Sequence, residues 1–157
     1  MEFIEALRGS KTHKKLQAMV KLSDRLMKAT LDGDEQQVAE IVGQIHDSDA
    51  GPDFYNNEQA LRSVLKLGYI SAIDDFVSIQ ELPTGKGYAD LAFIPRLGSS
   101  QPAVVVELKW NKTEHAAIDQ IKERNYPDVL KRFTDNILLV GISYDEATKQ
   151  HACKIER

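Results

Sequence analysis

The spacing of hydrophobic residues follows a helical repeat in the first third of the chain and changes to a strand repeat from about residue 76. Apolar residues within positions 11–30 recur every three or four residues, and those within 38–45 recur at i, i+3, i+4 and i+7. Each stretch therefore predicts an amphipathic helix. Asp32 and Glu35 have capping-box spacing at the start of the second helix. The apolar positions are Leu16, Met19, Val20, Leu26, Met27, Val38, Ile41, Val42 and Ile45.

An acidic, turn-rich segment at residues 47–52 follows these helices and is the clearest break in the sequence. We place a boundary there, between an N-terminal helical annex (residues 1–50) and a main domain (residues 51–157). The main domain opens with Asn56 and Asn57, which are good N-cap residues for a helix reaching Tyr69.

Beyond residue 75 the apolar period shortens and predicts strands. Residues 76–82 and 88–94, joined by a Gly-containing turn at 83–87, predict a β-hairpin. The resulting order is helix, three strands, helix, two strands, which is an α/β class. The remaining predicted elements are strands at 102–110, 137–144 and 150–155, a helix at 113–125 and a short helix at 127–133.

Composition is that of an ordinary globular protein. The chain has 157 residues, of which 42% are hydrophobic and 28% charged, enough for one domain with a small annex. No apolar run approaches the roughly 18 residues that a membrane span needs, and the N-terminus lacks a secretory pattern. The single cysteine, Cys153, excludes an internal disulfide and a four-cysteine zinc site. We expect a soluble, cytoplasmic protein with no membrane partner.

Charge is unevenly distributed about a net value of −4. Residues 1–30 carry seven basic and three acidic side chains, a net of +4, whereas residues 31–60 carry eight acidic and no basic ones, a net of −8. The simpler interpretation is two solvated helix faces. The alternative is that part of the annex is an interaction surface for another protein domain rather than for DNA.

The predicted strand at 102–110 ends in two charged residues. Glu107 and Lys109 alternate with Leu108, so they point to one face of the strand. Taken alone, this Glu-x-Lys pattern also fits a surface ion pair, which contributes little to stability. Asp90 strengthens a functional interpretation because aspartate is depleted in strands. If its strand neighbours 102–110, Asp90 and Glu107 could bind one Mg²⁺ through carboxylate oxygens, with Lys109 beside them. The alternative for Asp90 is a solvated carboxylate, or a partner of Lys109 alone.

Two further polar residues border this candidate site. Glu58 lies at i−3 and i−7 from the apolar Leu61 and Leu65, which predicts that it faces inward. An acidic residue in the first turn of a helix is also favoured by the helix dipole alone. Gln120 borders the buried face of the helix at 113–125, where an ordinary polar residue is an equally good explanation.

Together, Asp90, Glu107-x-Lys109, Gln120 and Glu58 resemble the PD-(D/E)XK nuclease superfamily. The resemblance is closer to the nuclease-like C-terminal domain of bacterial proteins that carry an AAA-type ATPase domain at their N-terminus. It covers residues of about 55–157 well and the annex more loosely. The stretches that carry it are Tyr55-Asn56-Asn57-Glu58, residues 81–90, Glu107-Leu108-Lys109-Trp110, residues 117–122 and Leu139-Val140-Gly141-Ile142.

The resemblance implies a restriction-endonuclease-like core, a central mixed sheet flanked by helices in the order αβββαβ. It implies a metal site for Mg²⁺ or Mn²⁺, with Asp90 and Glu107 as ligands, the Leu108 carbonyl as a third and Glu58 nearby. Lys109 would be the catalytic lysine and Gln120 a positioning residue. Ala89 stands where the family name has proline, a position without a chemical role.

The function that the resemblance implies is hydrolysis of phosphodiester bonds in nucleic acid, with DNA favoured. The alternative is a non-catalytic module that binds nucleic acid or protein and is associated with an AAA-type ATPase. Retention of Asp90, Glu107 and Lys109 together favours the enzyme. His151 and Cys153 share a strand face without a partner nearby in sequence, and we interpret both as structural.

Overall fold

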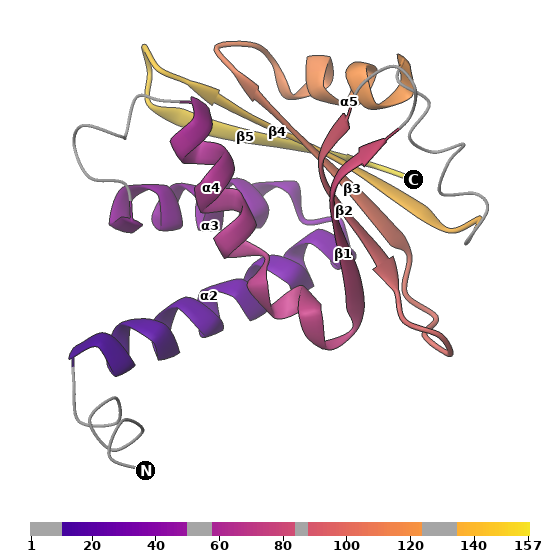
Figure 1. Ribbon diagram of the computed structural model, residues 1–157. Helices are drawn as coiled ribbons and strands as arrows, with labels where there is room; N and C mark the ends of the chain where they lie inside the picture. The colour runs from indigo at the N-terminus through magenta and orange to yellow at the C-terminus, as the bar shows by residue number, and fades with distance from the viewer. Residues whose placement is uncertain (1–10, 50–57, 84–87, 124–134) are drawn as a thin grey trace.

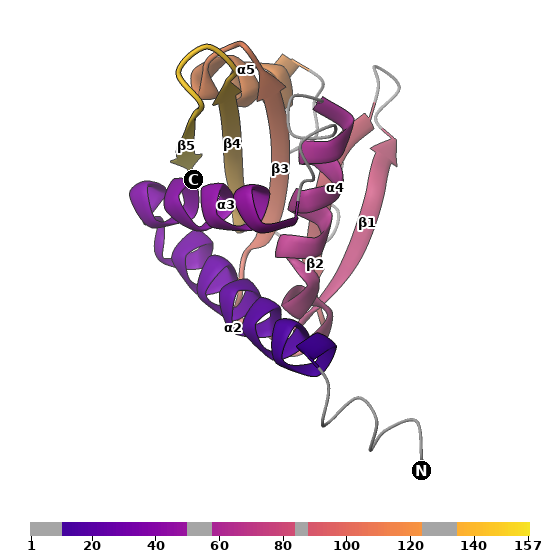
Figure 2. The ribbon, with the colours of Figure 1, turned by 90° about the vertical axis from the view of Figure 1, so that its left-hand side faces the viewer.

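The computed structural model describes residues 11–49, 58–83, 88–123 and 135–157. A five-stranded sheet lies between helices α2, α3 and α4 on one face and α5 on the other (Figures 1 and 2). The helices are α2 (Lys11–Asp32), α3 (Glu35–Asp49), α4 (Glu58–Gly68) and α5 (Glu114–Glu123), and a 3₁₀ helix, η1 (Ile70–Asp74), follows α4. The strands are β1 (Phe76–Pro83), β2 (Tyr88–Pro95), β3 (Ala103–Trp110), β4 (Ile137–Asp145) and β5 (Gln150–Glu156). The predicted α/β class and the predicted order of these elements are confirmed.

Strand order in the sheet follows the sequence, β1-β2-β3-β4-β5. Strands β1, β2 and β3 form an antiparallel meander, whereas β3 and β4 are parallel and β5 returns antiparallel. Parallel neighbours need a crossover connection, and α5 lies in the segment between β3 and β4. The mixed sheet therefore places the end of β3 next to the start of α5.

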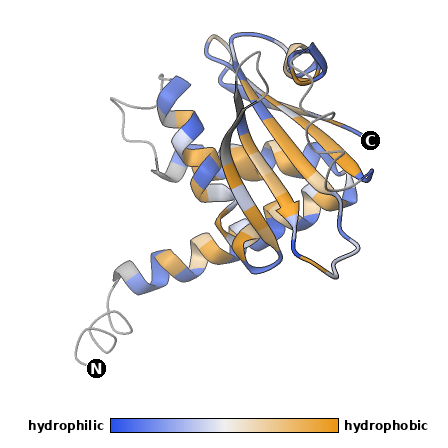
Figure 3. Cartoon of the chain, turned by 45° about the vertical axis from the view of Figure 1, so that its right-hand side comes forward, coloured by the Kyte–Doolittle hydropathy of each residue, from blue (hydrophilic) through white to orange (hydrophobic). Residues whose placement is uncertain are grey.

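One large hydrophobic cluster fills the space between the sheet and the helices α2, α3 and α4. The predicted apolar face of α3 is completely buried: Val38, Ile41, Val42 and Ile45 are each at most 1% exposed. In Figure 3 the hydrophobic colour is concentrated on the strands and on the helix surfaces that lie against them. The annex helices and the sheet thus share one core, and the domain boundary at residue 50 stays a prediction.

The stripe predicted for the first helix is only partly buried. Leu26 and Met27 belong to the large cluster, but Leu16 and Val20 are about half exposed because the N-terminal part of α2 extends beyond the packed helices. The predicted capping box was wrong. Helix α2 continues through Asp32, and Asp34 caps α3 instead, accepting a 3.1 Å hydrogen bond from the Gln37 backbone N–H.

Three predicted features lie outside the described residues: the N-cap at Asn56 and Asn57, most of the turn at 83–87, and the short helix at 127–133. The sequence pattern missed η1, a single 3₁₀ segment between α4 and β1. None of the described helices is both long and apolar enough to cross a membrane.

Candidate active site

Asp90 lies where β2 and β3 stop pairing. Their ladder covers Leu91–Phe93 opposite Val104–Val106, so Asp90 is the next residue and would face Glu107. At this position the Asp90 side chain replaces the backbone as the hydrogen-bond acceptor, because its Oδ2 accepts a 2.8 Å hydrogen bond from the Leu108 backbone N–H. The Asp90 N–H in turn points to Glu107 Oε2 at 3.4 Å. Each carboxylate therefore lies against the backbone of the neighbouring strand at this junction.

Glu107, Gln120 and Lys109 form a hydrogen-bonded chain on the α5 face of the sheet. Gln120 donates its amide N–H to Glu107 Oε1 and accepts a hydrogen bond from the Lys109 ammonium through its Oε1. Glu107 is only 3% exposed, so its charge needs such partners. Gln120 thereby orients a buried carboxylate and an ammonium at once. Its position at the border of the buried face of α5 did not by itself predict these two contacts.

Small residues on β4 make room for this arrangement. Gly141 lies beside Glu107 in the β3–β4 register, and Ser143 lies beside Lys109. A Cβ at Gly141 would lie 2.5 Å from the Glu114 carbonyl oxygen and 3.0 Å from Ala117 Cβ. Only glycine therefore allows α5 to approach β4 this closely. The sequence offered no signal for this role, because the glycine lies inside an otherwise apolar strand.

Glu58 does not face the core as its spacing predicted. Its side chain is 49% exposed at the first residue of α4, and it reaches the site through an arginine. Arg62 Nη2 donates to Glu58 Oε1 at 3.3 Å, and Arg62 Nε donates to Asp90 Oδ1 at 2.8 Å. Arg62 was missed from the sequence. Its position one turn after Glu58 was the available signal, but contact with Asp90 depends on how α4 packs across the sheet.

The donor set fits one hard cation with retained water. Mg²⁺ is commonly held by one or two carboxylates and completes its octahedron with water and other oxygens. Asp90 and Glu107 supply one carboxylate from each of two neighbouring strands, and the Leu108 backbone lies between Glu107 and Lys109. Among the residues that the structure describes, no three His, Cys, Asp or Glu side chains gather into a metal site by themselves. A cation here therefore depends on oxygens beyond the carboxylates.

A sequence model of the PD-(D/E)XK nuclease superfamily matches residues 56–153, which is more than half of the chain and includes every residue of this site. The chain belongs to this superfamily. The five-stranded mixed sheet with flanking helices is consistent with the restriction-endonuclease-like fold of PD-(D/E)XK proteins. PD-(D/E)XK membership indicates nuclease activity, and such nucleases typically use divalent metal ions. Comparisons with curated proteins and with solved structures gave no match.

The other titratable cluster joins α3 to β5 rather than lining the PD-(D/E)XK site. His46 Nδ1 lies 2.9 Å from His151 Nε2, and the two rings meet edge to face. Burial, and then the neighbouring His46, lowers the pKa of His151 to about 4, against a smaller opposing effect of Asp47. Burial also raises the pKa of the Cys153 thiol, which makes it a poor nucleophile. These features support a packing role.

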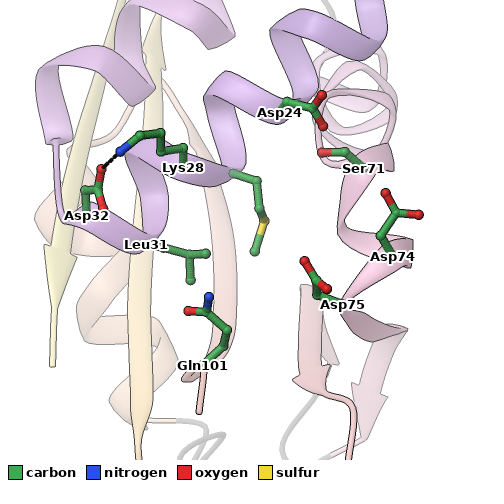
Figure 4. A pocket seen from close by; sticks show the side chains of 9 residues that line it. Asp24, Lys28, Leu31, Asp32, Ser71, Asp74, Asp75 and Gln101 are labelled. Atoms are coloured by element: carbon green, nitrogen blue, oxygen red, sulfur yellow. Dashed lines mark hydrogen bonds and ion pairs between the residues drawn. The ribbon is translucent and has the colours of Figure 1, made fainter. Parts of the chain in front are cut away.

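A separate hollow lies between α2 and η1, away from α5 (Figure 4). Asp24, Asp74 and Asp75 line it, and Lys28 pairs with Asp32 at 2.6 Å on one side. With Asp32, four carboxylates and one ammonium line the hollow, and this excess of negative charge repels a phosphate backbone. We therefore do not place a nucleic-acid contact there.

Proposed function

We propose that the protein is a metal-dependent nuclease that hydrolyses phosphodiester bonds of nucleic acid, with DNA favoured over RNA. The observation that carries the proposal is the junction of β2 and β3. The β2–β3 ladder ends there, the Glu107 carboxylate lies 3.4 Å from the Asp90 backbone N–H, and Lys109 is linked to Glu107 through Gln120. Burying charged groups is costly unless they are paired, hydrogen-bonded or bound to a metal ion, and this group is arranged so that a cation could join its existing partners.

In this proposal Asp90 and Glu107 hold Mg²⁺ or Mn²⁺, the Leu108 carbonyl is a third ligand, and Glu58 contributes negative charge nearby. When bound, the cation favours deprotonation of a water and offsets charge on the reacting phosphate. Glu107 is oriented for this task by the Gln120 amide, and Asp90 by the Leu108 N–H. Both carboxylates are therefore set in place before any ligand arrives.

Lys109 supplies the charge next to the reacting phosphate. Its ammonium is held by Gln120, whose other end is fixed to Glu107, so the cation site and the lysine share one positioning residue. A pre-oriented ammonium stabilises negative charge that develops in the transition state, and it loses little entropy at that moment. Gln120 is a positioning residue in this scheme.

The second candidate is a non-catalytic module that binds nucleic acid or protein and is associated with an AAA-type ATPase. The observation that favours it is the ion pair between Arg62 and Asp90, which is the kind of contact a purely structural aspartate makes. The ATPase association is supported by the resemblance and by half-exposed Leu16 and Val20 on α2. Absence of cleavage together with ATPase binding through α2 would favour this module.

The test is a cleavage assay on end-labelled double-stranded DNA, single-stranded DNA and RNA, each with Mg²⁺, Mn²⁺ or EDTA. We expect the wild type to cleave DNA only with a divalent ion. Asp90→Asn should abolish cleavage because it removes a ligand charge while keeping the side-chain shape. No cleavage of any substrate with either ion would reject the nuclease, and equal rates for wild type and Asp90→Asn would reject Asp90 as part of its active site.

A further inference from the structure

Arg62 connects α4 to the candidate site. It is 30% exposed, and its guanidinium spans two carboxylates, donating to Asp90 Oδ1 at 2.8 Å and to Glu58 Oε1 at 3.3 Å. A third contact, to Gln59 Oε1 at 3.2 Å, lies within the same helix. Arg62 is therefore attached to its own helix at one end and to the candidate metal ligand at the other.

Both oxygens of Asp90 are engaged in this arrangement. Oδ2 accepts the Leu108 N–H, which belongs to the strand backbone and is fixed in place. Oδ1 accepts from Arg62, a long and partly exposed side chain that can move. Because the guanidinium lies 2.8 Å from Oδ1 of the same carboxylate, a cation bound to Asp90 would lie within a few ångströms of it, and Asp90, only 14% exposed, leaves little solvent to screen the two charges. Two positive charges at that separation repel strongly.

A guanidinium released from Asp90 would stay near the site. Glu58 lies one helical turn before Arg62 and accepts from its Nη2, so α4 keeps the side chain beside the carboxylates. An arginine in this position suits a phosphate, because its planar fork matches two phosphate oxygens. The nucleic-acid backbone is the phosphate that the proposed function brings to this place.

We propose that Arg62 couples the two ligands of the site: it holds Asp90 while no cation is bound, and it moves to a backbone phosphate once a cation occupies Asp90. This inference rests on the proposed function. It makes Arg62 a positioning residue that weakens metal binding by the free protein and strengthens it when nucleic acid is present. Coupling of this kind is reciprocal, so the metal must also tighten nucleic-acid binding.

The first test uses Mn²⁺ alone, titrated by calorimetry into the full chain without nucleic acid. Arg62→Gln should bind Mn²⁺ about two- to fivefold more tightly than wild type, the scale of a partly exposed ion pair. Arg62→Lys keeps the charge but not the fork, and its affinity should lie between the two. Lys66→Gln, one turn further along α4, removes the same charge away from Asp90 and should match wild type.

Each alternative outcome decides a different point. Arg62→Gln affinity equal to or below that of wild type would overturn the competition between Arg62 and the cation. An equal gain in Lys66→Gln would also overturn it, because general charge would then be the cause. If Asp90→Asn binds Mn²⁺ as tightly as wild type, the proposed metal site itself is wrong, whatever Arg62 does.

The second test measures the coupling on a labelled DNA duplex in a Lys109→Ala background, where cleavage is slowed. Mn²⁺ should tighten duplex binding by Lys109→Ala. The ratio of duplex affinity with Mn²⁺ to that without it should be at least about threefold smaller in the Lys109→Ala, Arg62→Gln double variant than in Lys109→Ala. Equal factors in the two proteins would overturn the coupling role, even if both bind Mn²⁺ well. Thermal melting of each variant verifies that it is folded.

Discussion

The two faces of the sheet differ in how far hydrophobic packing extends along β3. On the face covered by α2, α3 and α4, the buried residues Val104, Val106 and Leu108 continue almost to the end of the strand. On the α5 face, packing by Val105 gives way to Glu107 and then Lys109. Side chains of one strand alternate between faces, so β3 carries a continuous core on one side and a polar site on the other.

This difference between the two faces of β3 explains how the buried charge of Glu107 is tolerated. Packing on the larger core anchors β3, and the small α5 cluster has only to hold Gln120 near Glu107. The larger core therefore determines stability, whereas the smaller one determines the geometry of the site. Substitutions on the two faces should separate these roles.

Ile41→Ala should give the largest loss of stability. The residue is 1% exposed in α3 and packs in the same cluster as the sheet, so the free energy of unfolding should fall by about 2–5 kcal/mol. Urea denaturation should show one transition, shifted equally for the helical circular dichroism and for Trp110 fluorescence. A Trp110 transition that does not move would mean that residues 1–50 fold as a separate annex. Val20→Ala, at a half-exposed position of α2, is the control.

Gly141→Ala should disturb the α5 face. The added Cβ would meet the Glu114 carbonyl oxygen at 2.5 Å, so α5 must shift, at a cost of about 1–3 kcal/mol. We expect the fractional loss of Mn²⁺ binding free energy to exceed the fractional loss of unfolding free energy, because Gln120 moves with α5. Gly43→Ala is the matched control, since its Cβ meets only the His151 side chain at 3.2 Å and alanine favours the helix. Equal losses in the two variants would contradict the special role of Gly141.

A smaller effect should follow acidification at the junction of α3 and β5. The pKa of His151 is about 4 in the folded protein, below the ordinary value of 6.5, so the unfolded chain binds the proton first. Stability should therefore be full above pH 6.5 and fall as the pH drops toward 4. We expect a loss of about 1–2 kcal/mol, because solvent screens this partly exposed ring. His151→Gln should flatten the slope of unfolding free energy against pH in that window, and an unchanged slope would contradict the assignment.

The order of elements was predictable because it depends on local periodicity. Alternation along β3 predicted that Glu107 and Lys109 share a face, whereas the approach of Asp90 to Glu107 was predicted only on the condition that β2 neighbours β3, which it does. The contact of Arg62 with Asp90 was not predictable, since it depends on how α4 lies across the sheet. The exposure of Leu16 and Val20 was missed for the same reason, because an apolar stripe does not reveal how much of it a partner helix covers. The need for glycine at 141 is visible only once α5 is in place.

The measurement that tests the central claim most directly compares Lys109→Ala with Lys112→Ala, an exposed lysine just beyond β3. Each is assayed for unfolding free energy, Mn²⁺ affinity and DNA cleavage rate. Lys109→Ala should stay within about 0.5 kcal/mol of wild type in stability, because the opposite face of β3 supplies the packing. It should retain Mn²⁺ binding and lose about 10²-fold or more in rate, while Lys112→Ala behaves as wild type. A Lys109→Ala protein that cleaves DNA at the wild-type rate would contradict the account.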